Sequence, residues 1–196
     1  MKIVGITGGI GSGKSVLSNL FEVFGIPVYI ADIEAKKIMN SSTEVRAKLI
    51  QKFGETIYSG DSLDRKKLSS LIFNDLSAIS YVNSIVHPAV QADFTQWLKS
   101  RSNLVVAIEA AILFESGFSS FVDFAVNVSA PVNTRIERVR KRDGLSEDEI
   151  ENRINNQISE EERNSRSDFI LINDDHHALI PQVEKLLSLA GCQLFS

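Results

Sequence analysis

One eight-residue segment near the N-terminus constrains the fold of this chain more than any other part of its sequence. Residues 8–15 read G-G-I-G-S-G-K-S and match the pattern G-x-x-x-x-G-K-S/T at every fixed position. Glycines let several backbone N–H groups converge on phosphate oxygens without Cβ clashes, and the positive end of a following helix strengthens the attraction. The pattern therefore predicts a phosphate-binding loop (P-loop) between a strand and a helix.

The last two residues of the motif carry its charge chemistry. Lys14 is expected to reach the β- and γ-phosphates of ATP, and the Ser15 hydroxyl is expected to ligate Mg²⁺. ATP and Mg²⁺ are thus the expected cofactors. The alternative interpretation is a tight glycine-rich turn followed by a surface lysine. We assign ATP binding to the loop and to the first residue beyond it: Gly9, Ile10, Gly11, Ser12, Gly13, Lys14, Ser15 and Val16.

The flanking sequence supplies the structural context that the motif needs. Residues 2–7 are apolar and β-branched and predict a buried strand, and residues 14–24 show helical spacing of their apolar side chains. Four further buried strands are predicted at Val28–Ala31, Leu104–Ile108, Phe124–Val128 and Phe169–Ile172. Strands that alternate with helices predict an α/β fold: a five-stranded parallel sheet covered by helices on both faces.

Two stretches interrupt this alternation, and both are candidates for substrate-handling parts. Residues 32–103 are mostly helical in pattern and polar, with a turn predicted at Ser59-Gly60-Asp61. Residues 135–165 form a charged helix pair. Its second helix is predicted to begin at a capping box of Ser146 and Glu149 and to carry Ile150, Ile154 and Ile158 on one face. We therefore expect a nucleotide-binding core of residues 1–31, 104–134 and 166–196, a helical acceptor subdomain of residues 32–103, and a lid of residues 135–165.

The other motifs and the size of the chain indicate the class of P-loop protein. The chain has neither the N-K-x-D nor the D-x-x-G pattern of GTPases. A small α/β protein with a helical insertion fits a metabolite or nucleotide kinase, in which catalysis is mostly positioning and charge neutralisation. Arg135, Arg138 and Arg142 share one helix face, where ATP phosphates would relieve their mutual repulsion. The alternative for these arginines is a solvated basic face. Arg153 and Gln157, at i and i+4 on the next predicted helix, could close over the same site.

Two acidic residues follow predicted strands at the edge where open parallel sheets bind ligands. Asp32, after the second strand, could accept a proton from an attacking hydroxyl or help to hold Mg²⁺, and its alternative role is the N-cap of a helix over residues 33–39. Glu109, at the end of the third strand, is similar to a Walker B acid, and a simple capping role competes with an outer-sphere metal role.

Bulk properties limit the remaining function classes. The net charge is −4, which does not favour a nucleic-acid partner. No apolar run approaches the ~18 residues of a membrane span, and the lone Cys192 fits a reducing compartment. We expect a cytoplasmic protein without nucleic-acid or membrane partners, which acts on a small molecule as a monomer or weak homo-oligomer.

The chain resembles the dephospho-CoA kinase family over essentially its whole length. The residues that carry the resemblance follow in the family's order: Ile6–Ser15, Ala31-Asp32, Leu63-Asp64-Arg65, His87-Pro88, Ile112-Leu113-Phe114-Glu115, Arg142-Asp143 and Asn173. It departs from the family pattern at Ile30, where an additional aspartate is common, and at Ala111, where proline is common.

The resemblance implies a reaction and several residue roles. The reaction is transfer of the ATP γ-phosphoryl group to the 3′-hydroxyl of the dephospho-CoA ribose, the last step of coenzyme A biosynthesis. By resemblance, Asp32 is the catalytic base, Arg142 the catalytic lid arginine that also binds ATP, and Asn173 part of the adenine-side loop. Arg65 and His87 would lie with Asp32 near the acceptor, although spacing alone favours a surface charge for Arg65 and a helix restart at His87-Pro88.

Two alternatives stay open at this point. The first is another small-molecule or nucleoside kinase on the same plan. The second is a non-enzymatic, ATP-gated binding module whose lid signals to a partner protein.

Overall fold

The computed structural model describes residues 1–72 and 75–191, and Cys192 lies outside the described residues. The chain divides into two compact units. The first combines residues 1–30 with residues 102–196, and the second consists of residues 31–101. We describe each unit separately. Within the described ranges, no helix is both long and apolar enough to cross a membrane.

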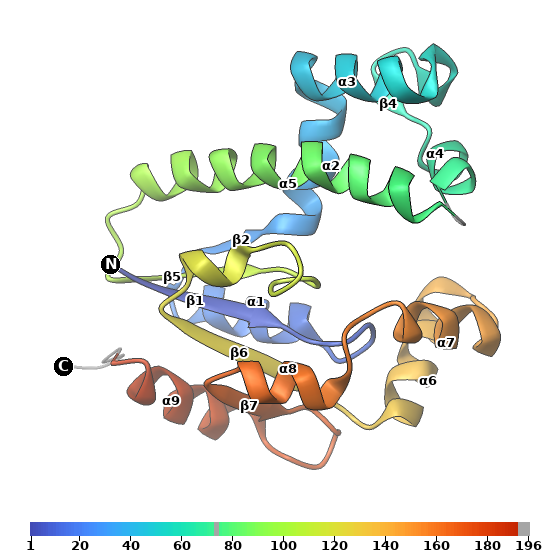
Figure 1. Ribbon diagram of the computed structural model, residues 1–196. Helices are drawn as coiled ribbons and strands as arrows, with labels where there is room; N and C mark the ends of the chain where they lie inside the picture. Colours follow the sequence, from blue (N-terminus) through green and yellow to red (C-terminus); the bar gives the residue numbers. More distant parts are fainter. Residues whose placement is uncertain (73–74, 192–196) are drawn as a thin grey trace. The chain divides into compact units, whose positions relative to one another are not determined.

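The first unit is built on a parallel sheet of five strands (Figure 1). In spatial order these are β2 (Val28–Ile30), β5 (Val105–Glu109), β1 (Lys2–Thr7), β6 (Phe124–Ser129) and β7 (Phe169–Ile172). The predicted fold class is confirmed, and the predicted strands agree with the observed ones to within a residue at either end. The most consequential difference concerns Ala31, which begins a helix instead of ending β2.

The strand register brings the ligand-binding edge of the sheet together. Ile6 of β1 lies opposite Glu109 of β5, and Thr7 lies opposite Asn127 of β6. On the far side of β5, Ile30 pairs with the same Glu109. The P-loop therefore leaves the sheet from its central strand, between the carboxyl ends of β5 and β6, as expected for ligand sites in open α/β sheets.

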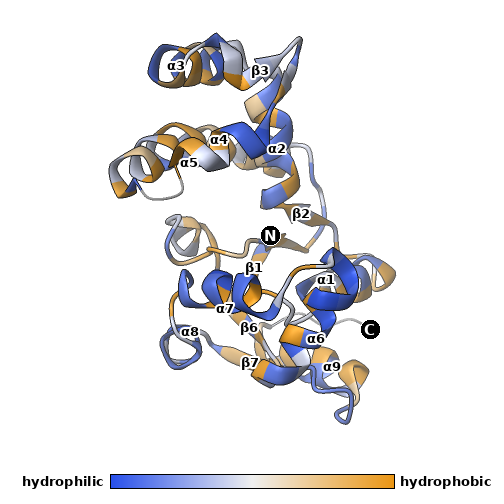
Figure 2. Ribbon diagram, turned by 90° about the vertical axis from the view of Figure 1, so that its right-hand side faces the viewer, coloured by the Kyte–Doolittle hydropathy of each residue, from blue (hydrophilic) through white to orange (hydrophobic). Residues whose placement is uncertain are grey.

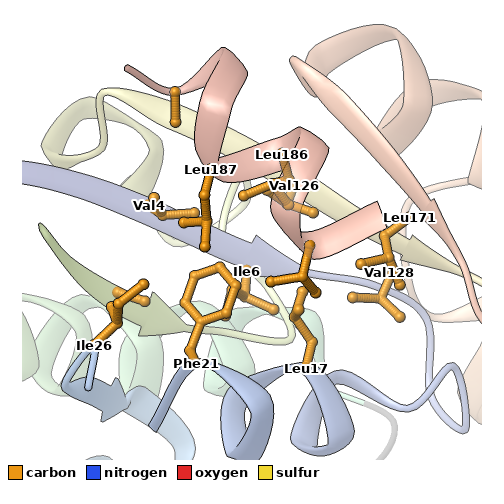
Figure 3. Packing of buried hydrophobic residues seen from close by; sticks show 13 residues of the cluster. Val4, Ile6, Leu17, Phe21, Ile26, Val126, Val128, Leu171, Leu186 and Leu187 are labelled. Carbon is orange, nitrogen blue, oxygen red and sulfur yellow. The ribbon is translucent and has the colours of Figure 1, made fainter. Parts of the chain in front are cut away.

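One face of the sheet is covered by α1 (Lys14–Val23) and α9 (Leu179–Leu189). Figure 3 shows Leu17 and Phe21 from α1 and Leu186 and Leu187 from α9 meeting side chains of the strands. The strand residues of this cluster include Val4, Ile6, Val126, Val128 and Leu171. Because alternate residues of a strand face the same side, this packing fixes which side chains of β1 and β6 face the other way.

The opposite face of β6 carries a polar side chain. Asn127, between the inward-facing Val126 and Val128, donates hydrogen bonds to Asn164 (2.6 Å) and Glu160 (3.1 Å) of α8 (Glu160–Arg166). The segment with the short 3₁₀-helix η2 (Phe118–Phe121) packs beside β1 on this same side, where a Cβ at Gly5 would lie 2.9 Å from Leu113. Both faces are therefore covered.

Two further helices of the first unit lie largely within residues 135–165, the stretch predicted to be a lid. α6 (Val132–Asp143) follows Pro131 and ends at Gly144 in the left-handed conformation, and α7 (Glu147–Asn155) begins with the predicted capping box of Ser146 and Glu149. The prediction that Ile158 continues the apolar face of this second helix is wrong, because α7 ends at Asn155.

The second unit is helical apart from one hairpin. Its helices are α2 (Ala31–Ser41), α3 (Thr43–Phe53), the 3₁₀-helix η1 (Glu55–Ile57), α4 (Arg65–Ile72) and α5 (Leu76–Lys99). Strands β3 (Tyr58–Ser59) and β4 (Ser62–Leu63) pair antiparallel around the predicted turn at Gly60. The expected helix restart at His87-Pro88 is wrong, because α5 runs through Pro88 without a break.

Candidate nucleotide-binding site

The P-loop has the backbone geometry that its sequence predicts. Gly13 is the N-cap of α1, with φ 94° and ψ 30°, a left-handed conformation that glycine adopts at little cost. The turn before it closes with a hydrogen bond from the Ser12 N–H to the Gly9 carbonyl (3.1 Å). Helix α1 starts at Lys14, so its positive end and its first N–H groups face the loop.

Two of the loop glycines are packed so closely that a side chain there would displace a neighbouring one. A Cβ at Gly9 would lie 1.9 Å from Nη1 of Arg135, and a Cβ at Gly13 would lie 2.1 Å from Nδ2 of Asn173. Carbon and nitrogen atoms in van der Waals contact are about 3.5 Å apart. The glycines at these positions therefore serve close packing against side chains as well as backbone freedom.

The Lys14 ammonium lies against the loop itself. Its Nζ donates hydrogen bonds to the carbonyl oxygens of Gly8 (2.9 Å) and Gly9 (3.4 Å). Ser15 follows at the exposed start of α1, and the Val16 side chain beside it is also exposed. A positive charge held at the mouth of an amide-lined loop is the arrangement that a polyphosphate requires.

Glu109 lies at the buried end of β5 and is bonded to a residue that the sequence did not single out. The hydroxyl of Ser18 donates to its Oε2 (2.5 Å). Ser18 lies one turn beyond Lys14 in α1 and is itself buried. The signal in the sequence was a serine directly after Leu17, on the buried side of α1. This hydrogen bond ties the carboxylate of the third strand to the helix that follows the P-loop.

Two side chains bind the same carbonyl oxygen in the second half of the loop. Asn173, which directly follows β7 and is 8% exposed, donates from Nδ2 to the Ser12 oxygen (2.8 Å). Arg138 of α6 donates to the same oxygen from Nη1 (3.4 Å) and binds Asp175 through Nη2 (2.7 Å). The expected adenine-side residue Asn173 is thus in direct contact with the P-loop.

The lid segment reaches the first half of the loop through Gln157, between α7 and α8. Its Oε1 accepts a hydrogen bond from the Ile10 N–H (2.9 Å). Arg142 is not part of these contacts. It forms a two-pronged ion pair with its neighbour Asp143, with both distances 2.8 Å, and its side chain is 63% exposed. Figure 2 shows α6, which carries Arg142 near its end, largely in the hydrophilic colour.

Comparisons with known proteins agree with this geometry. The family model described as dephospho-CoA kinase matches residues 2–178. The chain belongs to the dephospho-CoA kinase family. A dephospho-CoA kinase from Bacteroides fragilis is 44% identical over 94% of this chain and 91% of its own length, and one from Porphyromonas gingivalis is 40% identical over 95% and 93%. A crystal structure from Thermus thermophilus has a TM-score of 0.86 at 31% identity and covers 98% of both chains.

Family membership decides between the readings that the sequence left open. The chain is an ATP-dependent kinase of the last step of coenzyme A biosynthesis, and a nucleoside kinase or a non-enzymatic binding module no longer explains it. The P-loop fits the triphosphate for two reasons. Its glycines allow the backbone to pack closely, and the Lys14 ammonium supplies a positive charge at the loop.

The acceptor-side residues expected in the dephospho-CoA kinase family lie in the second unit. Asp32 is the exposed second residue of α2, so it neither ends β2 nor caps a helix from outside. Arg65 is the exposed first residue of α4. His87 is half-buried within α5, and burial lowers the pKa of its imidazole, which favours the neutral ring.

A buried ionic cluster beside the loop was missed by the sequence interpretation. Glu160 of α8 binds Arg163 through Oε2 (2.9 Å), while Arg135 of α6 lies against Gly9. Burial raises the pKa of the Glu160 carboxyl, but hydrogen bonds from Arg163, Ser129 and Asn127 outweigh that effect, so its pKa lies below the usual value. Neither Glu160 nor Arg163 belongs to a recognisable pattern, because their neighbours at 159–166 read as an ordinary solvated helix.

Proposed function

We propose that this chain transfers the γ-phosphoryl group of ATP to the 3′-hydroxyl of the dephospho-CoA ribose, with Asp32 as the base. The observation that carries the nucleotide half of this proposal is the P-loop, whose glycines, Lys14 ammonium and α1 terminus converge on one point. The transferred group needs little covalent assistance, so the chain's task is to position the two substrates and neutralise charge.

Residues of the first unit take the nucleotide roles. The β- and γ-phosphates are bound by the Lys14 ammonium and by the N–H groups of residues 9–16, other than those of Ile10, Ser12 and Val16, which donate to Gln157, Gly9 and Gly13. Asn173 supports the carbonyl side of the loop through Ser12 and borders the adenine. Arg142 exchanges its ion pair with Asp143 for the transferred group, because an exposed guanidinium is free to reorient at little energetic cost.

The donors beside the loop fit Mg²⁺. Ser15 offers a hydroxyl at the exposed start of α1, and Glu109 offers a carboxylate that Ser18 holds in place. Mg²⁺ in kinases keeps several waters and phosphate oxygens and uses few protein ligands. The described residues contain no group of three or more His, Cys, Asp or Glu side chains suited to a metal, in keeping with an ion that enters with ATP. When bound, it would neutralise charge that develops on the phosphates.

Asp32 is the proposed base because it follows the strand that ends at the ligand-binding edge of the sheet. Strand β2 ends at Ile30, opposite Glu109 at the ligand edge of the sheet, and Asp32 follows two residues later with an exposed carboxylate. A carboxylate near the phosphates can accept the proton of the attacking hydroxyl. Arg65 and His87 are the proposed contacts to the acceptor, where the neutral imidazole of His87 can donate or accept a hydrogen bond.

The test is Asp32→Asn with Glu34→Gln as its matched control, because Glu34 is an acid of the same helical turn that binds Lys37. We expect Asp32→Asn to keep ATP affinity and to lose about 10²- to 10⁴-fold in kcat, with Glu34→Gln unchanged. Turnover is measured as ADP release with dephospho-CoA, and NMR assigns the phosphate position on the product. Near-normal turnover of Asp32→Asn, or phosphate on another hydroxyl, would contradict the proposal.

A further inference from the structure

Behind the first half of the P-loop lies a cluster with more buried positive than negative charge. Arg135 and Arg163 are each 3% exposed. Glu160 is the one carboxylate that accepts an ion pair from either arginine among residues 1–72 and 75–191. Its two oxygens are engaged by Arg163 and by Asn127. Arg163 also donates to the Ile158 carbonyl (2.5 Å), and among the described residues only its Nε is buried without a hydrogen-bond partner, against two nitrogens of Arg135.

Arg135 is the member of the cluster whose charge is not matched. Within the described part of the chain, its Nε and Nη1 are buried without a hydrogen-bond partner. Burial lowers the pKa of its guanidinium, the Glu160 carboxylate opposes that effect, and Arg163 adds to it. A buried charge without full pairing destabilises a fold, and proteins retain such arrangements mainly at functional sites.

The position of Arg135 relates this charge to the nucleotide. Its Nη1 lies against Gly9, on the side of the loop that packs on α6, and its own backbone packs against Gly11. A triphosphate bound by the loop amides would bring several negative charges to the other side of one layer of backbone. Water is excluded from that layer, so the attraction is screened far less than at a surface.

We propose that Arg135 is a positioning residue for ATP: it supplies a buried positive charge behind the P-loop that is neutralised only when the polyphosphate binds in front. The Glu160 carboxylate attracts its guanidinium, and the like charge of Arg163 repels it. The charge acts through the loop, because Nη1 is buried and the Gly9 backbone lies beside it. Arg135 therefore makes the free enzyme less stable and the ATP complex more stable.

The competing explanation is a structural strut that joins α6 to the loop. The two explanations predict different changes in the unfolding temperature of the free protein when Arg135 is replaced. Removal of a strut lowers the unfolding temperature of the free protein. Removal of an unmatched buried charge leaves that temperature unchanged or raises it, because an apolar side chain of similar length is easier to bury.

The experiment compares Arg135→Met and Arg135→Lys with Arg140→Met, which removes one exposed charge from the same helix. For each full-length variant, thermal unfolding is measured without nucleotide, and calorimetry gives Kd for ATP, ADP, AMP and adenosine. For Arg135→Met we expect an unchanged or higher unfolding temperature and a Kd for ATP raised on the order of 10- to 100-fold. The loss should shrink from ATP to ADP to AMP and vanish for adenosine.

Two control variants show whether the loss of ATP affinity depends on the charge at position 135. Arg135→Lys should recover most of the ATP affinity, because it restores the charge, and Arg140→Met should match the wild type. A lower unfolding temperature for Arg135→Met, or failure of that variant to fold, would overturn the proposal in favour of a strut. An equal loss for ATP and adenosine would also overturn it, since only the shape of the site would then have changed.

Discussion

Replacement of Gly13 by alanine tests how tightly the P-loop is packed. The new side chain faces two separate penalties. The backbone at Gly13 has φ 94°, where a Cβ is strained, and that Cβ would lie 2.1 Å from Nδ2 of Asn173. Asn173 must then move away and give up its 2.8 Å hydrogen bond to the buried Ser12 carbonyl.

A second glycine separates the two penalties. Gly144 has φ 68°, and a Cβ there would meet nothing within 4 Å, so Gly144→Ala reports the backbone strain alone. We expect Gly144→Ala to lower the free energy of unfolding by about 1 kcal/mol. Gly13→Ala should add about 1–3 kcal/mol for the lost buried hydrogen bond. For a chain of this length each kcal/mol lowers the unfolding temperature by roughly 2–4 °C.

The assay is a double-mutant cycle of Gly13→Ala with Asn173→Ala, followed by denaturant unfolding and circular dichroism. Both single variants lose the same hydrogen bond, so the double variant loses it only once, and the coupling should recover about 1–3 kcal/mol. ATP affinity should fall at least tenfold in Gly13→Ala and stay normal in Gly144→Ala. Equal destabilisation of the two single glycine variants, or strict additivity in the cycle, would refute the reasoning.

Two further predictions concern charge. Arg142→Ala should lower kcat by up to about 10³-fold with little change in KM for dephospho-CoA. Lys141→Ala, the control, should leave kcat unchanged. Steady-state kinetics measures both variants, and an unchanged kcat for Arg142→Ala would show that Arg142 is only a surface charge. The lowered pKa of Glu160 means that its pairing stabilises the fold fully above its unfolded pKa of about 4.3 and progressively less as pH falls below that. Unfolding of wild type and Glu160→Gln from pH 7 to pH 3 should therefore converge at the acid end, and a constant difference would contradict the assignment.

The sequence predicted those parts of the site whose geometry is local. The P-loop, the individual strands and the capping box at Ser146 each follow from neighbouring residues, because backbone conformation and helix capping depend on short-range interactions. Local reasoning failed where a boundary depended on packing. The apolar spacing of Ile150 and Ile158 suggested one helix, yet the chain turns at Asn155 to bring Gln157 to the loop.

The sequence placed Gln157 and Asn173 near the nucleotide, but the groups that they contact could not be predicted because the partners are far apart along the chain. Gln157 meets Ile10 across 147 positions and Asn173 meets Ser12 across 161. Side-chain identity offers no sign of such pairs. The three arginines that share a helix face in the sequence illustrate the difficulty most clearly. Arg135 is buried, Arg138 is half-buried and bonded to the loop, and Arg142 is exposed.

These long-range contacts have a common consequence for how the enzyme handles ATP. Both halves of the P-loop are bonded to side chains from the lid segment or its neighbours: the Ile10 N–H to Gln157, and the Ser12 carbonyl to Asn173 and Arg138. A loop held on both sides cannot adjust to phosphate without moving those partners. We therefore expect nucleotide binding to be coupled to the placement of these side chains, so that a change which shifts Gln157, Arg138 or Asn173 also changes ATP affinity. The residues that support the loop are thus also the residues that connect it to α6 and to the segment between α7 and α8.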